Sequence, residues 1–168
     1  MTGNELVLVA GLDLMVGDPR WFPHPVRGMG QVIGWYDHGI RGLCRSPLAL
    51  RFAGVILALG LPAAVYLVVW GMVAQAGAVA DWLETAVTVA LASTTLAGRD
   101  LWDHAQAVKK PLQRGDIADA RLAVAMIVGR DTEQLSESEV VRATIETVAE
   151  STADGVIAPL FYLVLGGP

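Results

Sequence analysis

Residues 129–165 read GRDTEQLSESEVVRATIETVAESTADGVIAPLFYLVL, and this stretch says most about the fold of the chain. Carboxylates recur at helical spacing in its first part, and the part that follows is apolar and contains a proline. Soluble domains rarely place ionisable side chains directly beside a segment that resembles a lipid-facing helix. The junction therefore predicts helices and suggests polar chemistry at a membrane surface.

The composition deviates from that of soluble proteins toward that of membrane proteins. Of the 168 residues, 54% are apolar and 17% are charged, whereas soluble chains average about 45–50% and about 25%. The mean hydropathy is +0.49. A net charge of −5 argues against nucleic acid as a partner. The single cysteine, Cys44, excludes an internal disulfide and a multi-cysteine metal site.

The first residues do not form a signal peptide, because a basic region is missing and Glu5 and Asp13 flank or interrupt the apolar run. Segment 6–16 is too short to span a bilayer alone. It predicts a shallow or re-entrant helix, or part of a longer tilted span. Residues 155–168 begin a further membrane segment that reaches the end of the sequence, so we expect a truncated chain.

Two apolar stretches, 52–74 and 80–98, predict a transmembrane hairpin. The first has 23 uncharged residues, roughly 34 Å of helix against a hydrocarbon core of about 30 Å. Trp70 and Trp82 bracket the link, as interfacial aromatic residues do. All 12 Lys and Arg residues lie outside the hairpin, so both flanks are expected to be cytoplasmic. The alternative is a soluble helical protein in which both helices are buried.

Residues 99–151 predict a cytoplasmic helical region. Pro111 should stop a helix over 99–110. No stretch shows strand alternation, so we expect an all-α polytopic membrane protein in one domain, 1–168. The remaining signals mark two further helices: a cap at Asp116, the apolar positions Ile117, Ala120, Val124 and Ile127, an end at Gly129, and a capping box with staple at Ser136, Glu139, Leu135 and Val140.

The first candidate site is the proline-rich segment 17–27, whose prolines exclude a regular helix and stiffen the chain. It carries Asp18, Arg20, His24 and Arg27. Two arginines and a histidine suit a phosphate or a carboxylate. A membrane-edge loop that meets lipid headgroups is the other interpretation.

Two further candidate sites lie near the predicted helix that begins at Ser136: one is the turn before it, and the other is on the helix itself. The turn 129–132 offers Arg130 for an anion and Asp131 and Thr132 for capping or a ligand, although a simple helix end explains it as well. The carboxylates Glu146, Glu150 and Asp154 (the acidic row) share one helical face at spacing i, i+4, i+8. Carboxylate oxygens suit Mg²⁺, whereas a solvated helix face is the bland alternative.

Several motifs taken together resemble one family. In order and spacing the following segments resemble the adenosylcobinamide-phosphate synthase family (CobD/CbiB) of cobalamin biosynthesis: 12–13 (LD), 17–20 (GDPR), 24–27 (HPVR), 128–132 (VGRDT), 146–150 (ETVAE), 154–156 (DGV) and 158–161 (APLF). The chain departs from the pattern at Ser151, where that family usually has asparagine, so an amide donor is lost.

The resemblance implies a multi-pass inner-membrane protein whose polar motifs face the cytoplasm. Its family is expected to join aminopropanol, or its phosphate, to a propionate of adenosylcobyric acid with ATP and Mg²⁺. Family members continue well beyond position 168. The implied partners are the corrinoid, the amino alcohol, membrane lipid and other membrane enzymes of the corrin pathway.

On the same basis we expect side chains from distant segments to meet in one pocket beside the inner leaflet.

The competing classes of function are a non-catalytic membrane subunit that docks other proteins and a transporter, which would need charges inside its spans. The implied roles are metal ligands (Glu146, Glu150, Asp154), binding of phosphate or corrin carboxylates (Arg20, Arg27, Arg130, Thr132), a proton acceptor (His24) and orienting carboxylates (Asp18, Asp131).

Overall fold

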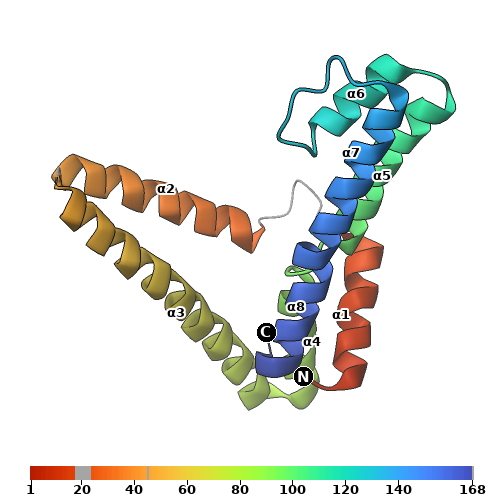
Figure 1. Ribbon diagram of the computed structural model, residues 1–168. Helices are drawn as coiled ribbons and strands as arrows, with labels where there is room; N and C mark the ends of the chain where they lie inside the picture. Colours follow the sequence, from red (N-terminus) through yellow and green to blue (C-terminus); the bar gives the residue numbers. More distant parts are fainter. Residues whose placement is uncertain (18–23, 45, 168) are drawn as a thin grey trace. The chain divides into compact units, whose positions relative to one another are not determined.

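The computed structural model describes residues 1–17, 24–44 and 46–167, and every regular element in these residues is a helix (Figure 1). The all-α fold predicted from the sequence is therefore confirmed. The elements are α1 (Gly3–Val16), α2 (Pro25–Leu43), α3 (Pro47–Val79), α4 (Asp81–Ser93), α5 (Gly98–Gln113), α6 (Ile117–Ala125), α7 (Glu137–Thr152), the π-helical turn η1 (Ala153–Ile157) and α8 (Ala158–Gly166).

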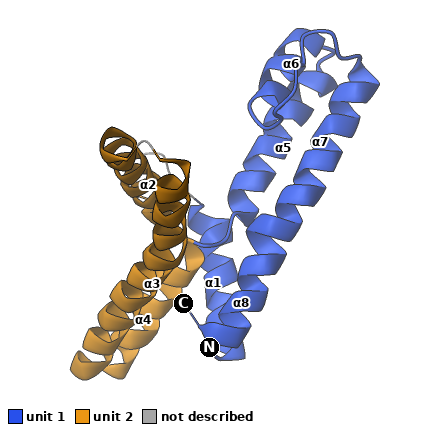
Figure 2. Cartoon of the chain, turned by 60° about the vertical axis from the view of Figure 1, so that its left-hand side comes forward, with its two compact units in different colours: residues 1–18, 95–167 blue, residues 19–94, 168 orange. Residues whose placement is uncertain are grey.

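The chain divides into two compact units, where the sequence led us to expect one domain (Figure 2). Unit 1 comprises residues 1–18 and 95–167, and unit 2 comprises residues 19–94 and 168. Helices α1 and α5 to α8 thus belong to unit 1, and helices α2 to α4 belong to unit 2.

The core of unit 1 lies where α5, α6 and α7 meet, and α5 and α7 run side by side (Figure 1). Ile117 and Ile127 pack against this core, so the predicted apolar face of α6 is confirmed. Fully burying a valine contributes roughly 1.5 kcal/mol or more. The buried core residues are Val108, Ala120, Val124, Val140 and Ala143.

The sequence suggested that α5 stops before Pro111, but the helix continues to Gln113. Its end is set instead by Gly115, which has a φ of 74°. The Gly115 amide donates to the carbonyl of Leu112 and the Asp116 amide donates to that of Pro111. This is a Schellman arrangement, in which glycine at the left-handed position satisfies the last free carbonyls of the helix.

The predicted caps of the next two helices are confirmed. The Asp116 side chain accepts from the amide of Asp119 at 3.1 Å at the start of α6. The Glu139 carboxylate accepts from the backbone nitrogen and the hydroxyl of Ser136, both at 2.7 Å, at the start of α7. Helix α6 ends at Ala125, earlier than predicted, and turn residues follow it.

Helix α7 continues through η1 into α8 without a break, so residues 137–166 form one helical rod. Pro159 explains the wide turn, because proline has no amide hydrogen for the carbonyl four residues earlier, which is Gly155. That carbonyl accepts a hydrogen bond from the amide of Ala97 at 2.9 Å instead. A Cβ on Gly155 would lie 3.2 Å from the Cβ of Ala97, so the close approach favours glycine.

In unit 2, the 33-residue helix α3 packs against α4 and α2. Its length is roughly 50 Å at 1.5 Å per residue, longer than the predicted stretch 52–74. Only 6% of its most apolar window is buried. Helix α3 and the rod 137–166 are the two helices in the described residues that are long and apolar enough to cross a membrane.

Helix α4 is shorter than the predicted span 80–98. It has 13 residues, roughly 20 Å, which is less than a hydrocarbon core of about 30 Å. The hydroxyls of Ser93 and Thr94 bond to the carbonyls of Ala90 and Leu91 and accompany the turn that ends it. The second arm of the predicted hairpin therefore does not reach spanning length.

Candidate functional site

Arg121 of α6 holds the turn 129–135 through two hydrogen bonds, one to its backbone and one from its side chain. The Thr132 hydroxyl donates to the Arg121 carbonyl at 3.1 Å, and the Arg121 Nε donates to the Leu135 carbonyl at 2.7 Å. Thr132 is only 5% exposed, so its hydroxyl is held inside the fold. Thr132 thus fixes the turn, and its predicted role in binding a ligand stays a prediction.

The two residues before Thr132 stay at the surface. Asp131 is exposed, and its Oδ1 accepts from the amide of Glu133 at 3.0 Å. Arg130 is also exposed, and its Nη2 lies 3.7 Å from the Glu146 carboxylate. The turn thus presents a guanidinium and a carboxylate to solvent on a backbone that Arg121 fixes.

Glu146 is shared by two arginines, and we call Arg130, Arg142 and Glu146 the arginine–glutamate cluster. The Arg142 Nε donates to Glu146 Oε1 at 2.7 Å, one helical turn away on α7. All three side chains remain about half exposed or more. Glu139 also interacts electrostatically with both arginines, so two carboxylates balance the two guanidinium groups. The exposed guanidinium N–H groups suit a phosphate or carboxylate ligand.

The acidic row does not gather as a three-ligand metal site. Among the described residues no group of three or more His, Cys, Asp or Glu side chains is placed to hold a metal ion. Glu146 is engaged by arginines, whereas Glu150 and Asp154 are exposed. Mg²⁺ is usually held by one or two carboxylates together with substrate phosphates, so Glu150 and Asp154 fit as such a pair.

The proline-rich segment 17–27 is described only in part. Asp18 and Arg20 lie outside the described residues. The Nδ1 of His24 accepts from the amide of Val26 at 3.2 Å and caps α2. To take up a proton at Nδ1, His24 would first have to give up this cap.

The structure brings together only some of the predicted site residues. Arg130 and Glu146 are close in unit 1, and His24 and Arg27 belong to unit 2. The expected meeting of the two sets in one pocket therefore stays a prediction.

Asp13 is an important polar residue that the predicted site does not include. It is 6% exposed, and its Oδ2 accepts from the amides of Gly98 at 2.9 Å and Arg99 at 3.3 Å. Arg99 also donates to the Leu14 carbonyl at 3.1 Å. Burial raises the pKa of the Asp13 carboxyl, and the hydrogen bonds from Arg99 and Gly98 partly offset that effect.

These contacts give Asp13 a structural role. The cap position of α5 is Ala97, whose side chain cannot accept a hydrogen bond. The Asp13 carboxylate takes over that function at the positive end of the helix dipole. An acidic residue inside an otherwise apolar segment was the sequence signal for this contact, but its partner cannot be read from local spacing.

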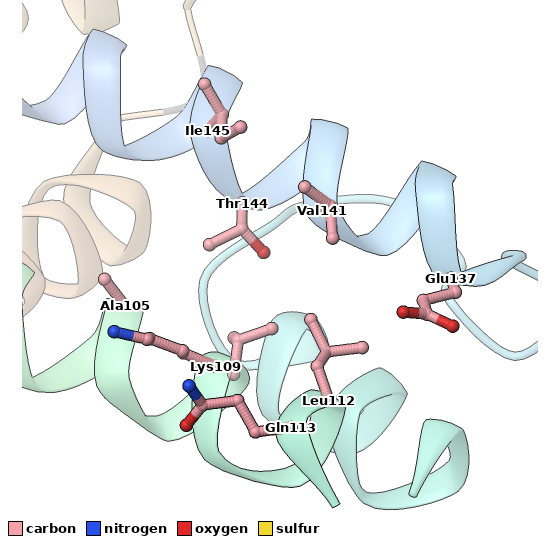
Figure 3. A pocket seen from close by; sticks show the side chains of 9 residues that line it. Ala105, Lys109, Leu112, Gln113, Glu137, Val141, Thr144 and Ile145 are labelled. Carbon is pink, nitrogen blue, oxygen red and sulfur yellow. The ribbon is translucent and has the colours of Figure 1, made fainter. Parts of the chain in front are cut away.

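The surface between α5 and α7 contains a groove of about 410 Å³, shown in Figure 3. Val108, Leu112, Val141 and Ile145 supply apolar walls. None of the predicted site residues lines it. The polar lining residues are Lys109, Gln113, Glu137 and Thr144.

Comparison with known proteins supplies a family. The model of the family described as "CobD/Cbib protein" matches residues 6–168. The chain is 45% identical to "Cobalamin biosynthesis protein CbiB" of Salmonella arizonae and 46% identical to "Cobalamin biosynthesis protein CobD" of Klebsiella pneumoniae. Each alignment covers 156 residues, 93% of this chain and 49% of the relative.

The chain therefore spans about half the length of the curated relatives it matches. The relative from Salmonella typhimurium, also named "Cobalamin biosynthesis protein CbiB", is 44% identical over the same share. No solved structure matches the chain.

Proposed function

The chain belongs to the CobD/Cbib family, and on that premise we propose that it acts in cobalamin biosynthesis, in amide ligation of aminopropanol or its phosphate to adenosylcobyric acid. The relatives' names support the pathway. The ligation step rests on the resemblance of the motifs, and the chain supplies about half of the length that its relatives use.

The arginine–glutamate cluster is the observation that carries the proposal. Substrates of this ligation bear phosphate and carboxylate groups, and Arg130 presents an exposed guanidinium beside Glu146 of α7. Arg130 sits on a turn that buried Thr132 fixes, so its backbone is preorganised. A preorganised guanidinium stabilises charge that develops on transferring oxygens.

Amide formation from a carboxylate and an amine requires an activated carboxyl group. In the proposed reaction the propionate oxygen receives the γ-phosphoryl group of ATP and ADP leaves. The amine nitrogen then bonds to the acyl carbon, inorganic phosphate leaves, and the ammonium proton goes to a base. His24 is the proposed base, which requires release of its Nδ1 from the Val26 amide.

Glu150 and Asp154 are the proposed holders of Mg²⁺, whose chemistry when bound is to neutralise phosphoryl oxygens. Glu146 is less suited to this task because arginines occupy its oxygens. Asp131 is proposed to orient the reacting groups. The remaining proposed residues, on the resemblance alone, are Asp18, Arg20 and Arg27.

We also place the protein in the inner membrane with these groups on the cytoplasmic side. Helix α3 supports this location, because Arg51 is its one charged residue and its apolar side chains face outward. A helix that is apolar all round needs an apolar environment on every side. Membrane lipid and the corrinoid are therefore proposed partners, with other membrane enzymes of the corrin pathway as further candidates.

The test uses two forms: this chain in membranes, and a chimera in which it replaces the matching half of the Salmonella typhimurium relative. Both are assayed with adenosylcobyric acid, aminopropanol or its phosphate, and Mg-ATP. In the active form Glu150→Ala should abolish ligation but leave membrane insertion unchanged. Glu137→Ala, the same change on the same helix outside the acidic row, should retain activity.

Two outcomes would contradict parts of the proposal. Full turnover by the Glu150→Ala protein would exclude the metal role of Glu150. If neither form ligates while both still recruit corrin-pathway proteins, the chain is a docking subunit and not part of a ligase.

A further inference from the structure

Helix α2 is amphipathic along its whole length. At about 100° per residue its apolar side chains fall within an arc of roughly 120°. Arg27, Gln31, Asp37, His38 and Arg41 lie on the opposite arc, which also carries Trp35. The apolar arc comprises Val26, Met29, Val32, Ile33, Tyr36, Ile40 and Leu43.

The composition of α2 makes it a weak helix in water. Five of its 19 residues are glycines, and each costs about 1 kcal/mol relative to alanine. In proteins most of the stability of a helix comes from the packing of its apolar face. The five glycines, all on the polar arc, are Gly28, Gly30, Gly34, Gly39 and Gly42.

Unit 2 covers only part of the apolar arc. No residue of α2 is buried. Tyr36, at the centre of the arc, is half-buried, but Val26 is 60% exposed, Val32 and Ile33 are each 43% exposed, and Leu43 is 84% exposed. Contact with α3 thus leaves both edges of the arc partly exposed.

One hydrogen bond sets the level of α2 along α3. The Tyr36 hydroxyl donates to the carbonyl of Ala53 at 3.0 Å. Ala53 lies two residues after Arg51, the single charge of α3, and 26 residues without charge follow it to Val79. Tyr36 is therefore anchored where the polar start of α3 gives way to its apolar length, the level that tyrosine prefers at a bilayer.

We propose that α2 lies in the lipid–water interface, with the edges of its apolar arc among the lipid acyl chains and its polar arc in water. The proposal rests on the membrane location of α3 proposed above. Lipid is favoured over a protein partner because α2 packs against α3, whose apolar side chains are exposed along its length. Two arginines against one aspartate also give α2 a net positive charge, which suits anionic headgroups.

The test places a fluorescent label at single cysteines in a Cys44→Ser background. The protein is reconstituted in vesicles of phosphatidylethanolamine and phosphatidylglycerol at 3:1, about the anionic content that attracts basic helices. Val32→Cys reports on the apolar arc, and its neighbour Gln31→Cys is the matched control on the polar arc. Leu59→Cys, at a site 70% exposed on α3, reports on the spanning helix.

Nitroxide-bearing lipid should quench the label at position 32 at least about threefold more than the label at 31, and aqueous iodide should show the reverse order. Equal iodide quenching at both positions would place α2 in water, and equal lipid quenching would place it inside the bilayer. Shielding of position 32 from both quenchers would mean a protein cover. Each of these three results overturns the proposal.

The Leu59→Cys label separates this proposal from the membrane location itself. If lipid does not quench the label at 59, the proposed membrane location fails. If lipid quenches position 59 but not position 32, only the placement of α2 fails. The pair Ile33→Cys and His38→Cys repeats the comparison in case the first pair disturbs folding.

Discussion

The carboxylate of Asp13 lies 2.9 Å from the backbone nitrogen of Gly98 and caps a helix that begins 85 residues later in the chain. Two half-buried amides at the start of α5 find their acceptor there. Because a helix N-terminus carries partial positive charge, a carboxylate is well suited to this position. The contact joins α1 to the helix that bears the core of unit 1.

Replacing Asp13 with alanine should lower the free energy of unfolding by about 1–2 kcal/mol, because the amides of Gly98 and Arg99 lose their acceptor. Asp13→Asn keeps an acceptor and should cost less. The control is Asp103→Ala, which removes an exposed carboxylate paired with Arg99 and should cost under about 0.5 kcal/mol. Thermal unfolding in detergent measures all three; equal losses for Asp13→Ala and Asp103→Ala would contradict the cap.

The stability contribution of Asp13 should depend on pH. Burial raises the pKa of the folded carboxyl above its ordinary value of 3.8, so the folded protein holds more protons than the unfolded chain between the two pKa values. The contribution is present below pH 3.8 and is lost as pH rises through the folded pKa. Asp13→Asn does not titrate, so melting curves from acid to neutral pH should show a smaller decline for this variant.

A methyl group at position 98 should disturb the same contact. A Cβ on Gly98 would lie 2.8 Å from the Asp13 Oδ2, so the capping atom itself would have to move. Gly98→Ala should cost about 1–3 kcal/mol. Gly11→Ala, at a helical glycine with nothing within 4 Å, should be neutral or stabilise by up to about 1 kcal/mol. Urea denaturation distinguishes them, and a neutral Gly98→Ala would show that the cap tolerates displacement.

Thr132→Val should destabilise the turn 129–135. The change keeps the shape but leaves the half-buried Arg121 carbonyl without the hydroxyl donor, a loss of about 1–2 kcal/mol. Thr144→Val is the matched control, because its hydroxyl bonds to the Val140 carbonyl within its own helix. Limited proteolysis should cut the turn faster in the Thr132 variant; equal rates would mean that the hydroxyl does not hold it.

Arg130 and Arg142 contact the same carboxylate and so provide a matched pair for function. If Arg130 binds a substrate anion, Arg130→Ala should lower kcat/KM for ligation by about 10²-fold or more. Arg142→Ala should have a small effect, because the exposed i,i+4 pair that it removes contributes about 0.3–0.5 kcal/mol. Steady-state assays of the chimera measure both, and equal losses would indicate a shared structural role.

Features that depend on near neighbours were predictable from the sequence. The apolar face of α6 repeats every three or four residues, and the caps at Asp116 and Ser136 bind amides within three residues. Such contacts follow from helix geometry alone. The motif resemblance, which depends on order and spacing along the chain, agrees with the family match.

Features that depend on tertiary approach were not predictable. The partner of Asp13 lies 85 residues away, and the Thr132 hydroxyl bonds to the carbonyl of Arg121, 11 residues earlier in α6. The length of α4 was overestimated because apolar residues continue past the turn after Ser93. Hydropathy reports the environment of a segment but not where its backbone stops being helical.

The wide turn at Ala153–Ile157 has a consequence for how the chain tolerates changes in length. One residue more than an α-helix needs is stored there, and a single residue turns a helix by about 100°. Deleting one residue in this segment would therefore restore regular α-helical geometry and leave the side chains of α8 facing nearly as they do now. The same deletion within α7, where no extra residue is stored, would turn α8 by about a quarter turn relative to the start of α7.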